Sequence, residues 1–259
     1  MSTILPVSAF SDNYIWLICD EQQRYAAIVD PGDATPVMTA LEEKNIEPIA
    51  ILITHHHSDH IGGISRLLQK YPQLPVYGSK NERIATLTHK VEQDDVIDLQ
   101  KIGIQLNVLD TFGHTAGHIS YYAPDMLFCG DTLFANGCGR VFDGTIEALH
   151  QSIEKIAKLP PETKIYCAHE YTLDNIGFAK WVEAENKDLL EREAICWNLI
   201  DNDQATLPTL LADELKTNPF MRCKEQVVIE QAEKFAGKKL PNASEVFRAI
   251  RQWKDSEYD

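Results

Sequence analysis

The residues best able to do chemistry form one short string, residues 54–60, which reads THHHSDH. It directly follows residues 49–54, a continuous apolar run typical of a strand buried on both faces. It directly precedes residues 61–71, where apolar side chains recur at helical spacing. Histidine and aspartate together suit first-row metal ions, zinc above all but also iron or manganese. The string therefore predicts a metal site where a strand ends and a helix begins.

The spacing inside the string divides its members between two positions. Side chains at i and i+2 of an extended chain point the same way, so His55 and His57 can reach one ion. By the same alternation His56 points elsewhere and is expected to be structural. Asp59 and His60 lie where the chain turns into the helix and could serve a second ion. A weak metal-binding tract or a tag remnant is the alternative, but this run is internal and is matched downstream by further ligands.

Three further candidate ligands each end a short apolar run that predicts a strand. They are His114 after residues 104–112, Asp131 after residues 126–130, and His169 after residues 164–168. A symmetric arrangement follows, with His55, His57 and His114 on one ion, Asp59, His60 and His169 on the other, and Asp131 bridging. We expect His118 to support the ligands from behind, and His89 and His150 to be surface or hydrogen-bonded residues.

Composition limits the partners. The 259 residues carry 24 Lys and Arg against 39 Asp and Glu, a formal net charge of −15. A field of this sign repels phosphate backbones and anionic lipid, so we expect neither nucleic acid nor a membrane as a partner. With 44% hydrophobic and 24% charged residues, the chain resembles an ordinary globular protein. Its length fits one large domain or two smaller ones and allows a substantial core.

The cysteines and the first residues indicate a cytoplasmic protein. Six cysteines are scattered without a C-x-x-C pair, which disfavours a disulfide scaffold or a zinc finger and favours buried, reduced thiols. Residues 1–19 show no secretory signal and no Arg-rich transit peptide. We find no apolar run long enough to span a bilayer.

The pattern of elements changes near residues 172–175. Before this point, short apolar runs predict strands, including a hairpin of residues 14–20 and 25–30, with helices between them. After it, strand-like alternation is lost. The predicted helices are 34–45, 61–71 and 145–158 in the first part, and segments within 174–202, 208–217, 224–236 and 243–254 in the second. We therefore expect a metal-binding catalytic domain at residues 1–173 and a helical domain at residues 174–259.

The ligand string, with GHTAGH at residues 113–118, GDTLF at residues 130–134 and the late histidine, resembles the metallo-β-lactamase superfamily. Within it the chain is similar to the glyoxalase II family, the hydroxyacylglutathione hydrolases, and this similarity covers essentially the whole chain. The stretches that carry it are DNY at 12–14, VDPGD at 29–33, NGCGR at 136–140, AHEYT at 168–172, NPFMR at 218–222 and the basic C-terminal helix. The resemblance implies an α+β fold, a four-layer αββα sandwich followed by a smaller, mainly helical C-terminal domain.

The resemblance also implies an activity. It implies two divalent metal ions on the ligands named above, usually zinc and sometimes iron or manganese. Asp59 and Asp131 would orient a hydroxide that bridges the ions. The implied glutathione contacts are Arg140, Tyr171, Arg251 and Lys254. The implied reaction is hydrolysis of S-(R)-lactoylglutathione and related 2-hydroxyacylglutathiones to glutathione and D-lactate, the second step of methylglyoxal detoxification, by a monomer.

Basic residues near the C-terminus fit such a substrate. Residues 234–254 hold six basic residues and one acid. Arg248, Arg251 and Lys254 follow one another at i,i+3 spacing, so one helix face can present all three. Glutathione carries two carboxylates, which such cations would hold. Without the family resemblance, a solvated basic face is the favoured interpretation.

Three positions depart from the family pattern. Phe112 stands where proline is common, and Ser58 where a bulkier residue is often found. Phe142 replaces a tyrosine present in some members and removes one hydroxyl contact to the substrate. None of these departures removes a metal ligand.

Four other functions are alternatives. A glutathione-persulfide dioxygenase shares the scaffold and the glutathione ligand but resembles a mononuclear iron design, so metal count and oxygen uptake discriminate. A β-lactamase is disfavoured by the cytoplasmic indications and the extra helical domain. An RNA-processing nuclease would need a basic surface, which the net charge of −15 disfavours. A non-catalytic binding module would not require a complete ligand set.

Overall fold

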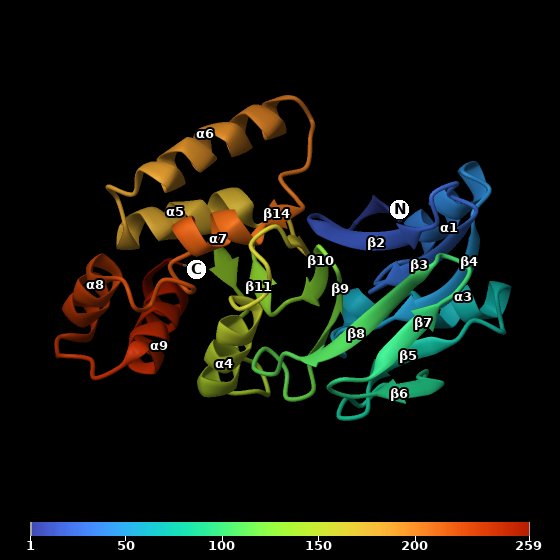
Figure 1. The fold of residues 1–259 in the computed structure, drawn as a ribbon, viewed down its shortest axis with the longest axis horizontal. Coiled ribbons are helices and arrows are strands. Elements are labelled where there is room, and N and C mark those ends of the chain that lie inside the picture. Colours follow the sequence, from blue (N-terminus) through green and yellow to red (C-terminus); the bar gives the residue numbers. More distant parts are fainter. Residues whose placement is uncertain (1, 259) are drawn as a thin grey trace.

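The computed structural model describes residues 2–258, and its strands form two six-stranded sheets that face each other (Figure 1). The first sheet holds, in chain order, β1 (Thr3–Ala9), β2 (Asn13–Cys19), β3 (Tyr25–Val29), β4 (Glu47–Leu52), β5 (Val76–Ser79) and β6 (His89–Val91). The second runs β14 (Thr209–Leu210), β13 (Lys164–Cys167), β10 (Met126–Gly130), β9 (Ile119–Ala123), β8 (Ile104–Asp110) and β7 (Val96–Leu99). A small hairpin joins β11 (Leu133–Phe134) and β12 (Gly137–Cys138). The predicted hairpin is present, because β2 and β3 pair antiparallel.

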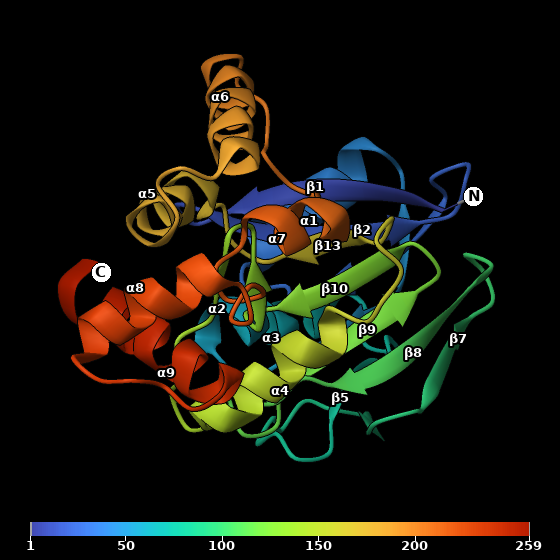
Figure 2. The same cartoon turned by 60° about the vertical axis from the view of Figure 1, so that its left-hand side comes forward.

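Helices cover the outer faces of both sheets. Apolar side chains between the sheets, such as Leu52 and Tyr121, belong to the main core. A second core lies outside the first sheet, where α1 (Ala34–Glu43) and α3 (Ile64–Lys70) pack. On the far side, α4 (Ile146–Ile156) lies along the second sheet (Figure 2). These layers, helices, sheet, sheet and helices, confirm the predicted αββα sandwich.

The helix predicted at residues 61–71 begins earlier and is interrupted. A four-residue helix, α2 (Ser58–Ile61), is followed by Gly62 and Gly63 before α3 begins. A Cβ at Gly62 would lie 2.7 Å from the carbonyl oxygen of Gly32. Glycine at position 62 therefore lets the chain just after the ligand string pass close to the turn that follows β3.

The C-terminal part is mainly helical, as predicted. Its helices are α5 (Thr172–Val182), α6 (Lys187–Asp201), α7 (Leu211–Thr217), α8 (Gln226–Ala236), α9 (Ala243–Trp253) and the π-helix η1 (Lys254–Tyr258). The helix predicted at residues 208–217 was wrong at its start, because residues 209–210 form β14 and pair antiparallel with β13. Phe220 and Phe247 belong to the main core. The C-terminal helices thus share their core with the sheets.

The fold also bears on two predictions, that the cysteines are buried and unpaired and that no segment spans a membrane. All six cysteines are unpaired and buried, and burial raises the pKa of Cys138 to about 11, so that thiol stays protonated. Among the helices of residues 2–258, none combines the length and the apolar composition that a membrane crossing needs.

Candidate metal centre

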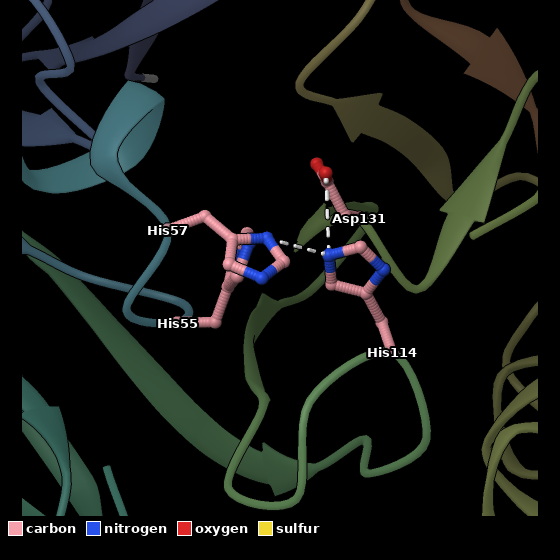
Figure 3. A group of neighbouring side chains, drawn as sticks. All are labelled: His55, His57, His114 and Asp131. Atoms are coloured by element: carbon pink, nitrogen blue, oxygen red, sulfur yellow. Dashed lines mark hydrogen bonds and ion pairs between the residues drawn. The ribbon is translucent and has the colours of Figure 1, made fainter. Parts of the chain in front are cut away.

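Three histidine rings converge on one point (Figure 3). Nε2 of His55 and Nε2 of His114 each lie 3.0 Å from Nδ1 of His57. His55 and His57 lie on the extended segment after β4 and point the same way, as the alternation predicts, while His114 comes from the loop after β8. We call these residues the three-histidine cluster. His55 lies fully buried behind His57, which faces a cavity.

A second group of ligands lies beside the first. Oδ2 of Asp59 is 3.4 Å from Nε2 of His60 and 3.4 Å from Nε2 of His169. Asp59 and His60 belong to α2, and His169 follows β13. The three ligand atoms all lie within 4.8 Å of one another. We call Asp59, His60 and His169 the mixed cluster.

Asp131 lies between the two clusters. Its Oδ1 is 3.3 Å from Nε2 of His60, and its Oδ2 is 3.6 Å from Nε2 of His114. The residue before it, Gly130, has φ of +48°, and a Cβ there would lie 2.4 Å from the hydroxyl oxygen of Thr54. Only glycine fits this turn. The structure therefore brings all seven predicted ligands together, with Asp131 between the clusters.

Neutral groups hold the outer nitrogens, those that point away from the centre, of two rings of the three-histidine cluster. The Thr54 hydroxyl donates its hydrogen to Asp30 at 2.7 Å and so accepts one from Nδ1 of His55 at 3.1 Å. Nδ1 of His114 donates to the carbonyl oxygen of Arg140 at 2.7 Å. Burial lowers the pKa of all three rings, most strongly that of His55. The rings are therefore neutral, and those of His55 and His114 turn a lone pair toward the centre of the cluster.

Carboxylates hold the outer nitrogens of the mixed cluster. Nδ1 of His60 is 3.1 Å from Asp30, and Nδ1 of His169 is 2.7 Å from Asp12. Burial opposes protonation of both rings, but the surrounding carboxylates, Asp131 foremost, outweigh it. The pKa of His60 is raised well above its usual value, and that of His169 is raised to about 10.

The residues around both clusters fit a bound cation. Two buried side-chain atoms of the described residues, Nε2 of His60 and Oδ1 of Asp131, have no hydrogen-bond partner, although they lie 3.3 Å apart as an ion pair. In the three-histidine cluster, two lone pairs face a single nitrogen of His57, which can hold only one hydrogen. Unsatisfied buried polar atoms are costly, and a cation among them would satisfy both groups. Imidazole and carboxylate donors suit a divalent first-row metal ion.

The residues that support the mixed cluster are not among those predicted from the sequence. Nδ2 of Asn13 donates to Oδ2 of Asp59 at 3.1 Å, beside the contact from Asp12 to His169. Asp30, in the turn after β3, lies 3.1 Å from Nδ1 of His60 and holds that ring. The DNY and VDPGD stretches contain these residues and were noted only as part of the resemblance. Their spacing carries no signal that pairs them with histidines so far away in the chain.

Two other histidines lie where they were predicted. Nε2 of His118 accepts the backbone N–H of Asp131 at 3.2 Å, and its Nδ1 lies 3.1 Å from the hydroxyls of Thr111 and Thr132. It therefore supports Asp131 from behind. His56 turns away from both clusters toward Glu82.

One cavity of about 470 Å³ joins the clusters to basic side chains. Its lining includes five of the predicted ligands: His57, Asp59, His114, Asp131 and His169. It also includes all four residues predicted as glutathione contacts: Arg140, Tyr171, Arg251 and Lys254. The cavity thus has a metal-ligand end and a cationic end.

Acidic and amide side chains hold the cations of that second end. Arg251, only 1% exposed, donates to the carbonyl oxygen of Cys138 at 3.1 Å and to Asp255 at 2.9 Å. Lys254 donates to Oδ1 of Asn175 at 3.0 Å. Arg140 is 56% exposed, with its Nε 3.8 Å from Asp255. Two guanidinium groups therefore approach the same carboxylate at the edge of the cavity.

The prediction that one helix face presents three cations toward the substrate was wrong for Arg248. This residue forms an ion pair with Glu147 of α4 and another, at 3.5 Å, with Glu245. The reason is that α9 packs against α4. The first turns of that face are therefore covered by α4, and only its C-terminal end, with Arg251 and Lys254, reaches the cavity.

Aromatic rings form part of the cavity wall. The Tyr171 ring stacks on His169, with centroids 4.8 Å apart. Burial, with Asp12 nearby, raises the pKa of Tyr171 to about 12, so its hydroxyl stays a donor. The departure noted at Phe142 leaves an apolar ring, 64% exposed, whose centroid lies 4.8 Å from that of His57 and 5.1 Å from that of His114.

Comparisons with known proteins cover nearly the whole chain. The sequence model of the metallo-β-lactamase superfamily matches residues 10–169, and that of the hydroxyacylglutathione hydrolase C-terminus matches residues 170–257. The hydroxyacylglutathione hydrolase of Nitrosomonas europaea is 48% identical, with 99% of this chain and 97% of the relative covered. That of Nitrosomonas eutropha is 47% identical, with 99% of both covered. The crystal structure of ETHE1 from Myxococcus xanthus superposes with a TM-score of 0.64 at 25% identity, covering 96% of each chain.

Proposed function

Because the chain belongs to the hydroxyacylglutathione hydrolase family of the metallo-β-lactamase superfamily, we propose that it hydrolyses S-(R)-lactoylglutathione and related 2-hydroxyacylglutathiones. The products are glutathione and D-lactate. One observation carries the proposal: a single cavity has a His/Asp metal site at one end and three basic side chains at the other. A thioester at the metal end would leave the two carboxylates of glutathione near the cations.

We propose that two divalent metal ions bind at the metal end of the cavity. Zinc is the preferred metal, with iron or manganese as alternatives. One would be held by the three-histidine cluster and one by the mixed cluster, with Asp131 shared. When bound, such ions lower the pKa of water to about 7 and polarise a carbonyl oxygen. The donor set supports this assignment, since Nε2 of His60 and Oδ1 of Asp131 are buried without a hydrogen-bond partner.

Two carboxylates would orient the attacking water. Asp59 is 37% exposed on its side chain and lines the cavity, and contacts with His169 and His60 hold its pKa well below the usual range. Burial would raise the pKa of Asp131, but the charge of His60 outweighs it, and this pKa too is lowered. Both groups therefore stay ionised and can accept a hydrogen from water. A thiol with a pKa of about 8.5 leaves as thiolate without a strong general acid.

The cationic end would bind the glutathione moiety. Arg140, Arg251 and Lys254 supply positive charge for its two carboxylates. The protonated hydroxyl of Tyr171 can donate a hydrogen bond near the metal end. Phe142 offers only apolar contact, so the hydroxyl contact that a tyrosine would give there is absent.

A hydrolysis assay tests the activity. Metal-replete protein should consume S-(R)-lactoylglutathione and release free thiol and D-lactate in equal amounts. A lactoyl thioester of a small thiol without carboxylates should react much more slowly, because it cannot use the cationic end. Failure to hydrolyse the glutathione thioester would refute the proposal. Oxygen uptake with glutathione persulfide, together with one iron per chain, would support the dioxygenase instead.

Substitution of Arg251 and Lys254 together by alanine tests the cationic end. Hydrogen bonds to charged groups contribute about 1.5–3 kcal/mol each, or roughly 10- to 100-fold for each residue, so we expect KM to rise by about 100-fold or more while kcat changes less. The matched control is Arg248→Ala on the same helix, which should leave KM unchanged, because Arg248 pairs with Glu147. Circular dichroism would verify that the doubly substituted protein is folded. An unchanged KM in that folded protein would show that the two cations do not bind substrate.

We also propose, on the sequence arguments, that residues 1–173 form the catalytic domain and residues 174–259 the glutathione-binding domain of a cytoplasmic monomer. Light scattering should then give a mass near the 29.3 kDa of one chain. A mass of twice that value at micromolar concentration would contradict the monomer.

A further inference from the structure

Glu82 is a buried carboxylate outside the cavity lining, and its side chain is only 3% exposed. Its Oε2 lies 2.5 Å from Nδ1 of His56, and its Oε1 accepts a hydrogen bond from the Thr115 hydroxyl at 2.5 Å. His56 stands between two members of the three-histidine cluster, and Thr115 directly follows the third, His114. One carboxylate therefore contacts both of the loops that supply this cluster.

The turn that carries Glu82 has a fixed place between these loops. The backbone N–H of Glu82 donates to the carbonyl oxygen of Ser79, and that of Asn81 donates to the Ser79 hydroxyl. On the other side the turn packs against the loop after β8, since a Cβ at Gly117 would lie 2.8 Å from the carbonyl carbon of Asn81. Backbone hydrogen bonds and close packing thus hold the carboxylate in position.

We infer that Glu82 is a positioning residue that sets the separation between the two loops of the three-histidine cluster. Side chains alternate along the extended segment, so holding His56 on one side fixes the direction of His55 and His57 on the other. Holding Thr115 does the same for His114, whose Nε2 lies 3.0 Å from His57. A metal site needs its ligand distances within about 0.2 Å of the preferred values, so the separation of the two loops matters for binding. The inference rests on the proposed assignment of this cluster to one ion.

Both contacts of Glu82 serve the three-histidine cluster, whereas the mixed cluster is held by Asp12, Asn13 and Asp30. Loss of Glu82 should therefore weaken one ion and spare the other. In Glu82→Ala we expect the affinity for one of the two zinc ions to fall by up to roughly 10-fold, the lower end of the effect of losing a direct partner of a metal ligand, because Glu82 acts through the neighbours of the ligands. Glu82→Gln keeps the side-chain length, an acceptor and a donor, so its amide can restore both contacts.

The experiment is competitive titration of the metal-free protein with zinc and a chromophoric chelator, repeated with cobalt to follow the visible spectrum. The expected result is one weakened site and an altered cobalt spectrum in Glu82→Ala, with both restored in Glu82→Gln. The matched control is Glu92→Ala, a surface acid that pairs with Lys80, which should bind both ions as the wild type does.

Three results would overturn the inference: wild-type affinity at both sites in Glu82→Ala, equal weakening of both sites, or failure of Glu82→Gln to restore binding. A wild-type protein that binds only one ion would contradict the binuclear proposal, and the inference would fail with it. Lactoylglutathione hydrolysis by the wild type tests the proposed activity separately.

Discussion

Asp131 lies between the three-histidine cluster and the mixed cluster, whose surroundings differ in charge. Outer nitrogens of the first face a hydroxyl and a carbonyl, at Thr54 and Arg140. Those of the second face the carboxylates of Asp30 and Asp12. A carboxylate partner raises the basicity of a histidine ligand more than a neutral partner does. Two sites that appear equivalent from their ligand count are therefore different in their chemistry.

The difference decides where protons sit when no metal is bound. Burial keeps the rings of the three-histidine cluster neutral near pH 7, because it lowers their pKa values. Carboxylates keep His60 and His169 protonated, because they raise the pKa values. An ion entering the first cluster finds lone pairs ready, whereas an ion entering the second must displace protons. The negative charge of the carboxylates around the mixed cluster is therefore balanced either by the protons on His60 and His169 or by a bound metal ion.

Removal of the shared ligand should have the largest effect. In Asp131→Ala we expect both ions to be lost or weakened and kcat/KM to fall on the order of 10³-fold or more, beyond the 10- to 100-fold expected for an outer partner. Elemental analysis and the lactoylglutathione assay measure the two effects. Asp98→Ala, at an exposed position of β7, is the control. A variant that still binds two ions with wild-type affinity would refute the shared position of Asp131.

The ligands could be predicted because their signals are local. Alternation along a strand pairs His55 with His57, and an apolar run ending in a polar residue marks Asp131. Such patterns span only a few residues, so one sequence suffices to find them.

Their supporting residues could not be predicted in this way. Asp12 meets His169 across 157 positions, and Glu82 meets Thr115 across 33. These contacts exist only after the sheets have stacked. The same limit explains Arg248, since helix spacing gives its face but not the helix packed against it. It also explains why β14 was not predicted, because its two residues form a strand only through their pairing with β13.

The pH dependence of metal binding should separate the two clusters. Variants that keep one cluster each allow the test: His57→Ala leaves the mixed cluster, and His169→Ala leaves the three-histidine cluster. The pKa of His169 is about 10 and that of His60 is raised as well, so both carry protons below these values. Zinc affinity of His57→Ala should therefore rise with pH by up to roughly 100-fold per unit around neutral pH, as two protons are displaced.

The other variant should show little change over the same range. The pKa values of His55, His57 and His114 lie below the usual value of about 6.5, so above that pH these rings have no proton to lose. Calorimetry in two buffers of different ionisation enthalpy gives the protons released directly. Equal proton release by the two variants would remove the distinction between the clusters.

A smaller effect should follow from changing the partner of one histidine. In Asp12→Ala the His169 ring loses the carboxylate that orients it and raises its basicity. We expect affinity at the mixed cluster to fall by roughly 10- to 100-fold, with the three-histidine cluster unaffected. Gln22→Ala, at an exposed position of the turn between β2 and β3, is the control. This variant is the counterpart of Glu82→Ala, and the two should weaken different ions in the same zinc titration. If Asp12→Ala and Glu82→Ala weaken the same ion, the two clusters are not held by separate sets of residues. The proposed difference between the clusters is then wrong.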